Sequence, residues 1–150
     1  MNIHFVCTGN TFRSRMAEAY LNSKNIPNIK ASSSGIRAIN NLDGDITSYT
    51  KKLLSDLGIL KYTNKKWTQT TKEKLLNADL VVLMKEEHLS WVKDHLDFTP
   101  KNYLVFNVDD ITDSIKGDKF KRNEFIKLTF QTISSKIDNL TSIAGSDPAR

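Results

Sequence analysis

The chain has very little cysteine. Cys7 is the only one among 150 residues, which excludes disulfide frameworks and zinc sites built from several cysteines, and suits a reducing compartment. The three histidines, His4, His88 and His95, do not form a recognised metal-binding spacing. We expect His88 and His95 to lie on one exposed helix. Few side chains therefore remain that could hold a metal ion.

Long hydrophobic runs are also missing. The longest apolar runs, such as residues 80–84, are far shorter than the ~20 residues that a transmembrane helix needs. The first residues do not show the signal-peptide pattern of a charged segment, an apolar core and a small-residue cleavage site. We therefore expect a soluble, cytoplasmic protein with no membrane partner.

Positive charge is in modest excess and is widely spread. The 22 Lys and Arg residues against 17 Asp and Glu residues give a net charge of +5, which permits attraction to anions. The lysines are scattered through most segments, which favours a solvated surface over a nucleic-acid-binding stripe. We therefore expect no nucleic-acid partner.

The size and composition of the chain predict one globular domain. Hydrophobic residues make up 39% and charged residues 26% of the 150 residues, a balance that can bury a core and argues against disorder. A chain of this length is the size of a single domain. We expect one domain over residues 1–144 and a flexible tail over 145–150.

Short apolar strands alternate with helical patterns along the chain. We expect strands at 2–6, 29–33, 78–84 and 103–106, and helices from 14 to about 21, 45 to 57, 86 to 96 and 119 to about 140. A further helix is expected to begin shortly before residue 75. Gly58 is expected to end the helix over 45–57 by adopting a left-handed conformation. Residues 37–44 are expected to form a surface loop. This alternation predicts an α/β fold, a three-layer α/β/α arrangement around a four-stranded parallel sheet.

Two reactive groups follow predicted strands directly. Cys7 comes at the end of the first strand, and Asp109 and Asp110 come after the last strand. Parallel strands bring their carboxyl ends to one edge of the sheet, where such folds bind ligands. We therefore expect the thiol and a carboxylate to converge although about a hundred residues separate them.

The loop between Cys7 and Arg13 has the composition of an anion-binding loop. A connection of this length between a strand and a helix can curl so that its backbone N–H groups point at one anion. The helix dipole and the Arg13 guanidinium would then keep Cys7 as a nucleophilic thiolate. Gly9 and Asn10 suit positions of positive φ. A lone cysteine after a strand is more often a buried, inert residue, but this context reverses that preference.

The segment VCTGNTFRS at 6–14, followed by MAEA at 16–19, resembles the active-site loop of the low-molecular-weight protein-tyrosine phosphatases. The resemblance extends more loosely through 33–35, 57–59 and 78–84 to Asp110, and so covers nearly the whole chain. It implies a four-stranded parallel sheet and phosphate monoester hydrolysis through a cysteinyl-phosphate intermediate, with neither a metal nor an organic cofactor.

The resemblance also implies a role for individual residues. Cys7 is the nucleophile, Arg13 holds the phosphoryl group, and Asp110 is the general acid, with Asp109 as the alternative. Ser14 donates to the thiolate, and Asn10 and Ser33 belong to a hydrogen-bond network that fixes the loop. The residues expected to surround the substrate phosphate are Thr8, Gly9, Asn10, Thr11, Phe12 and Ser14.

The sequence departs from the family pattern at several positions. Phe12 stands where a second cysteine is usual, so oxidised Cys7 has no internal partner. Arg15 stands where proline is usual, and either helps to bind phosphate or is a solvated surface residue. Ile111 stands where the acid is usually followed by proline, and no aromatic wall for a phosphotyrosine ring is evident in the residues after it. Thr11 resembles the members that act on phosphoarginine.

Three functional interpretations remain open. The first is a phosphatase that acts on phosphorylated protein, most simply on phosphotyrosine, and releases inorganic phosphate. The second is a protein-arginine phosphatase. The third is a phosphate-binding module that kept the loop but lost efficient turnover through the changes at Phe12, Arg15 and Ile111.

Overall fold

A computed structural model of the chain describes residues 1–145 and contains one sheet of four parallel strands. The strands are β1 (Asn2–Cys7), β2 (Lys30–Gly35), β3 (Leu80–Leu83) and β4 (Tyr103–Val105), in the order β2-β1-β3-β4. Every neighbouring pair is parallel. The predicted α/β fold with a four-stranded parallel sheet is confirmed.

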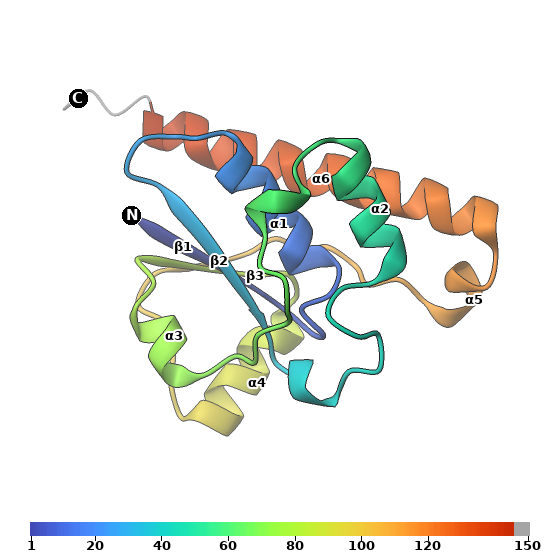
Figure 1. The fold of residues 1–150 in the computed structure, drawn as a ribbon. Coiled ribbons are helices and arrows are strands. Elements are labelled where there is room, and N and C mark those ends of the chain that lie inside the picture. The colour runs from blue at the N-terminus through green and yellow to red at the C-terminus, as the bar shows by residue number, and fades with distance from the viewer. Residues whose placement is uncertain (146–150) are drawn as a thin grey trace.

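Helices cover both faces of the sheet, which gives three layers (Figure 1). The helices are α1 (Arg13–Ser23), α2 (Ser48–Asp56), α3 (Lys72–Leu76), α4 (Glu86–Leu96), α5 (Asp113–Lys116) and α6 (Lys119–Gly145), with short 3₁₀ turns at Ala38–Asn40 and Leu60–Tyr62. Figure 1 shows α1, α2 and α6 on one side of the sheet and α3 and α4 on the other. No described helix is long and apolar enough to cross a membrane.

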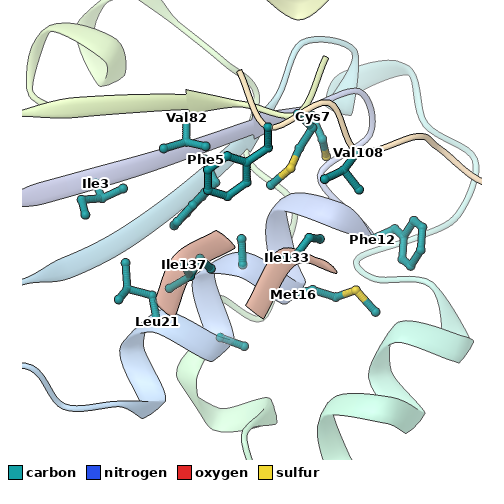
Figure 2. Close-up of a cluster of buried hydrophobic side chains, with 14 of the residues drawn as sticks. Ile3, Phe5, Cys7, Phe12, Met16, Leu21, Val82, Val108, Ile133 and Ile137 are labelled. Carbon is teal, nitrogen blue, oxygen red and sulfur yellow. The ribbon is translucent and has the colours of Figure 1, made fainter. Parts of the chain in front are cut away.

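The alternation of side chains along β1 divides the core between the two faces. Ile3, Phe5 and Cys7 are buried in the cluster formed with α1 and α6, whereas Val6 belongs to the cluster beneath α3 and α4. This is the two-residue period of a strand that is covered on both sides. Figure 2 shows the first cluster, with Cys7 and Phe12 at one end and Ile3 at the other.

Several predicted boundaries shift by a few residues. β2 begins at Lys30 and continues to Gly35, and α1 begins at Arg13 and ends at Ser23. The helix expected from residue 45 begins at Ser48, because the preceding segment makes hydrogen bonds to α1 and the Cys7 loop. Gly58, with φ 74°, follows the end of α2, as its residue type predicts.

The last helix, α6, extends further along the chain than expected. α6 continues from Lys119 to Gly145, beyond the predicted end near residue 140. The tail predicted at 145–150 lies, except for Gly145, outside the described residues. The single domain over 1–144 stays a prediction.

Candidate active site

The loop between β1 and α1 is shaped by Asn10. This residue has φ 56°, a left-handed conformation that asparagine tolerates better than most residues. Its Nδ2 donates to Ser14 Oγ at 2.7 Å and to Ser33 Oγ at 3.0 Å, and its Oδ1 accepts from the Thr68 N–H at 2.8 Å. The network expected between Asn10 and Ser33 is therefore present in the structure. Gly9 lies outside the left-handed region, so positive φ is required at Asn10 but not at Gly9.

The loop after Cys7 packs closely against Gly35 of β2. Gly35 is paired with Cys7 across β1 and β2. A Cβ atom at Gly35 would lie 2.5 Å from Thr8 O, 2.6 Å from Asn10 N and 2.8 Å from Gly9 C. Only glycine therefore allows the loop to come so close to β2. The sequence indicates this role only weakly, through a glycine that follows the strand predicted at 29–33.

Cys7 and Ser14 form the reactive pair of the loop. Cys7 is 2% exposed, and its Sγ lies 2.9 Å from Ser14 Oγ. Ser14 Oγ already accepts the hydrogen bond from Asn10 Nδ2. That bond does not use the hydroxyl proton of Ser14, so Ser14 is able to donate to the sulfur of Cys7.

The side chain of Arg13 links the loop to the segment after β4. Its guanidinium is 1% exposed, and NH1 donates to the backbone oxygen of Val108 at 2.8 Å. NH2 lies 3.3 Å from Thr8 Oγ1 and 3.5 Å from Asp110 Oδ2. Figure 2 shows Val108 next to Cys7. The sheet edge thus brings Cys7, Arg13 and Asp110 together, as the positions after the strands predict.

Asp109 and Asp110 have different surroundings. Asp110 is half exposed at 51% and lines the cavity above Cys7. Asp109 points instead to Lys85, with Oδ1 2.7 Å from Nζ. That hydrogen bond and the charge of Lys85 lower the pKa of Asp109, which disfavours the protonated form that a general acid needs. The geometry therefore favours Asp110 as the carboxyl group that faces a substrate.

A cavity of about 360 Å³ opens above Cys7. The residues around it come from the Cys7 loop, the segment 37–43, α2 and the end of β4: Cys7, Thr8, Gly9, Thr11, Phe12, Arg13, Arg37, Asn40, Asn41, Asp43, Tyr49 and Asp110. The segment expected to be only a surface loop therefore forms one wall. Nothing in its sequence distinguished it from an ordinary polar loop.

An aromatic wall is present, and α2 supplies it. Tyr49 packs edge-on against Phe12 with ring centroids 5.5 Å apart, and both line the cavity. Burial raises the pKa of Tyr49 to about 12, so the ring stays uncharged. The wall that was not evident in the residues after Asp110 is thus provided by a residue sixty positions earlier in the chain.

The match to known proteins covers nearly the whole chain. Residues 2–138 match the model of the family described as low molecular weight phosphotyrosine protein phosphatase. The chain belongs to this family. It is therefore related by descent to phosphatases, as the resemblance of its loop implied.

Relatives of this low-molecular-weight phosphatase fall into two groups by name. The chain is 30% identical to the low molecular weight protein-tyrosine-phosphatase PtpB of Staphylococcus aureus, over 95% of this chain and 99% of the relative. It is 32% identical to the protein-arginine-phosphatase of Bacillus subtilis, over 78% of this chain and 81% of the relative. The low molecular weight protein tyrosine phosphatase of T. tengcongensis has the same fold, with a TM-score of 0.75 and 26% identity, over 95% of this chain and 98% of that structure.

Arg15, which replaces the usual proline of this phosphatase family, is buried. It is 1% exposed, so the solvated surface position expected as one interpretation is wrong. It does not line the cavity above Cys7 either, which speaks against the other interpretation, phosphate binding. NH1 donates to the backbone oxygens of Asn10 at 3.1 Å and Asp45 at 2.8 Å, and NH2 donates to that of Asn64. Because these partners lie far apart in the sequence, nothing local predicted the burial.

Arg15 has a buried acidic partner beneath the loop. Glu18 lies 3.9 Å from its guanidinium and accepts hydrogen bonds from Ser33 and Thr63. Burial raises the pKa of Glu18 and lowers that of Arg15, since each charge loses water. The Arg15 side chain therefore supports the phosphatase loop from below and does not face the cavity.

The expectation that His88 and His95 share an exposed helix is only half correct. Both lie on α4 and His95 is exposed, but His88 is fully buried and contacts Thr8 of the phosphatase loop. Within the described residues, no group of three or more His, Cys, Asp or Glu side chains could hold a metal ion.

Proposed function

We propose that the protein is a cytoplasmic protein phosphatase that uses Cys7 as its nucleophile. The observation that supports this most directly is the convergence of three groups on one cavity. The Cys7 sulfur lies 2.9 Å from Ser14 Oγ, the Arg13 guanidinium lies beside Asp110, and the cavity above them is lined by all three of Cys7, Arg13 and Asp110. A nucleophile, an anion-binding cation and a proton donor are the groups that phosphoryl transfer through an enzyme intermediate needs.

In the first step, the Cys7 thiolate attacks phosphorus. The S–P bond forms while the bond from phosphorus to the leaving group breaks, and Asp110 gives its proton to the departing atom. Arg13 and the loop amides around Thr8 and Gly9 stabilise the charge on the phosphoryl oxygens. The N-terminus of α1 also stabilises this negative charge. No side chain of the cap residue Phe12 occupies its N–H groups, and its first turn holds no acidic residue.

In the second step, water hydrolyses the cysteinyl phosphate. Asp110, now a carboxylate, takes a proton from the water as its oxygen attacks phosphorus. The S–P bond breaks, and inorganic phosphate leaves. Ser14 donates to the sulfur as it departs with negative charge. Nucleic acid has no part in this reaction, and the open cavity suits a phosphorylated protein side chain.

Phosphotyrosine is the first candidate substrate. Phe12 and Tyr49 supply an apolar, aromatic wall to the cavity, against which a phenyl ring can pack. Phosphoarginine is the second candidate. Thr11 lines the same cavity, and two relatives of the chain are named protein-arginine-phosphatase. The carboxylates of Asp43 and Asp110 could pair with a guanidinium.

The experiment compares hydrolysis of an aryl phosphate by wild type and variants. Cys7→Ser should abolish turnover. Asp110→Asn should slow it by about 10²–10⁴-fold and leave phosphate binding intact, as loss of a general acid does. Asp109→Asn is the matched control, and we expect a much smaller effect because Asp109 faces Lys85.

Two outcomes of this experiment would contradict the proposal. Tight phosphate binding without any turnover by wild type would support the alternative of a phosphate-binding module. An unchanged rate in Asp110→Asn would remove Asp110 from its role as the acid. Turnover of phosphotyrosine and phosphoarginine peptides, measured side by side, then decides between the two substrates.

A further inference from the structure

His88 is a fully buried histidine that touches the phosphate loop from outside it. It lies on α4, on the opposite face of the sheet from α1, and is 0% exposed. Its Nε2 is 3.0 Å from Thr8 Oγ1. His88 has no part in the phosphoryl transfer proposed for Cys7, Arg13 and Asp110.

The protonation of the His88 ring follows from its second contact. The backbone N–H of Lys85 donates to Nδ1 at 3.0 Å, so Nδ1 cannot carry a proton. A neutral imidazole that carries no proton on Nδ1 carries it on Nε2. His88 therefore donates to Thr8. Burial and the charges of Arg13 and Lys85 lower the pKa of His88 to about 3, which keeps the ring neutral near pH 7.

Thr8 receives a second donor on the same oxygen. Arg13 NH2 lies 3.3 Å from Thr8 Oγ1. A hydroxyl oxygen accepts two hydrogen bonds and donates one. With His88 and Arg13 as its two donors, the oxygen has only its own proton left to offer. Thr8 lines the cavity together with Cys7, so an acceptor bound in that cavity is the natural partner for this proton.

We propose that His88 is a positioning residue that fixes the Thr8 hydroxyl as a hydrogen-bond donor to a phosphoryl oxygen bound above Cys7. This inference rests on the proposed function, because it assumes that the cavity binds a phosphoryl group. A donor fixed in this way favours an unprotonated phosphoryl oxygen over a hydroxyl, and thus the dianion over less charged forms. His88 acts only through Thr8 and does not itself reach the substrate.

Two substitutions at His88 separate its two hydrogen bonds. In His88→Asn, the side-chain oxygen can still accept from the Lys85 N–H, but the shorter side chain no longer reaches Thr8. In His88→Gln, the side-chain nitrogen can occupy the position of Nε2 and still donate to Thr8. Direct binding of inorganic phosphate, measured by titration calorimetry, should weaken by about tenfold or more in His88→Asn, as expected for a lost hydrogen bond to a charged group. His88→Gln should restore most of the affinity.

A double-mutant cycle with Thr8 tests whether His88 acts through that hydroxyl. Thr8→Val should weaken phosphate binding at least as much as His88→Asn does. Adding His88→Asn to Thr8→Val should then cause no further loss, because the hydroxyl that His88 orients is gone. A merely structural role for His88 would lower the melting temperature and leave the two effects additive.

If His88→Asn does not fold, the protonation of the His88 ring in wild type provides a separate test. The imidazole nitrogen shifts of wild type should show the proton on Nε2, and a proton on Nδ1 would overturn the inference. Additive losses in the cycle, or normal phosphate affinity in His88→Asn, would also overturn it while wild type still hydrolyses aryl phosphates. A wild type that neither binds phosphate nor turns over would overturn the proposed function as well.

Discussion

At the scale of single residues, Gly35 sets the shape of the active-site loop. A side chain there would meet three backbone atoms of the loop within 2.8 Å, and backbone cannot rotate away as a side chain can. Gly35→Ala should therefore displace the loop. Because a shift of about 1 Å in catalytic groups can cost 10²-fold in rate, we expect kcat/KM for an aryl phosphate to fall by about that factor.

Gly117→Ala is the matched control for this prediction. A Cβ atom at Gly117 would lie 3.6 Å from Asp113 O, which is ordinary van der Waals contact, and its φ is not positive. Both the rate and the melting temperature of Gly117→Ala should match those of wild type. Wild-type kcat/KM in Gly35→Ala would show that the loop does not depend on this close approach.

The sequence predicts the reactive residues of the site better than the residues around them. Cys7 and Arg13 lie in one short segment, and Asp110 follows a strand, so local pattern and sheet topology suffice to bring them together. His88 was expected on an exposed helix, and Arg15 either at the substrate phosphate or on the surface, where charged residues mostly lie. Their burial depends on hydrogen-bond partners tens of residues away, such as Asn64 for Arg15 and Thr8 for His88, which no local pattern reveals.

At the scale of elements, Arg15 joins three segments that have no secondary structure of their own. From its place on α1, it donates to the Cys7 loop at Asn10, to the segment before α2 at Asp45, and to Thr63 and Asn64 after the second 3₁₀ turn. Two of these segments contain residues that line the cavity above Cys7, the Cys7 loop and the segment with Asp43. One guanidinium can satisfy all of them because its five N–H groups form a planar fork.

Arg15→Met should destabilise the protein strongly. The substitution leaves Glu18 buried without its cation and leaves several carbonyl oxygens without a donor, and breaking a buried pair in this way costs about 3–5 kcal/mol. Chemical denaturation measures the free energy of unfolding. Arg37→Met is the control, since Arg37 is exposed and surface changes usually stay within about 0.5 kcal/mol. Equal stability of Arg15→Met and wild type would refute this role.

The predicted elements differ from the observed ones mainly where a loop is tied down. α4 has the predicted bounds, Glu86–Leu96, because its apolar residues are regularly spaced and local features mark both ends. The Lys85 N–H donates to His88 at the start, and Asp97 is left-handed at the end. α2 starts three residues later than expected, since Thr47 donates through both its N–H and its hydroxyl to Thr11 O in the Cys7 loop. The short helix α5 was not predicted, because its four residues give no periodic pattern.

At the scale of the whole molecule, the central strand β1 contains a buried histidine that makes folding sensitive to acid. His4 is 3% exposed, and its ring nitrogens each lie 2.7 Å from a serine hydroxyl, Ser32 and Ser34. Burial, with a smaller effect of Lys74, lowers the pKa of His4 to about 4 from 6.5. Between pH 6.5 and pH 4, the unfolded chain binds a proton at His4 and the folded chain does not. The free energy of unfolding therefore falls as the pH falls.

The predicted loss from His4 is absent above about pH 7, grows as the pH falls, and becomes complete only below the folded pKa of about 4. One pKa unit corresponds to about 1.4 kcal/mol, so the penalty should approach about 3 kcal/mol near pH 4. Unfolding free energies measured at pH 7 and pH 4.5 should therefore fall less in His4→Asn than in wild type. His88 and Glu18, whose pKa values are also shifted, are common to both proteins and cancel in the comparison.

His95→Asn is the control for the pH series. His95 is exposed on α4, so its replacement should leave the pH dependence of the unfolding free energy as it is in wild type. The same loss between pH 7 and pH 4.5 in wild type and in His4→Asn would contradict the assignment of this acid sensitivity to His4.

The most direct test of the proposed chemistry is to trap the phosphorylated enzyme. Wild type is mixed with an aryl phosphate, quenched with denaturant within the first turnovers, and analysed by peptide mass spectrometry. We predict a phosphoryl group on Cys7, formed and lost at rates that account for turnover, and neither the adduct nor turnover in Cys7→Ala. Hydrolysis that persists in Cys7→Ala, or a phosphoryl group on another residue, would contradict a cysteinyl-phosphate mechanism for this protein.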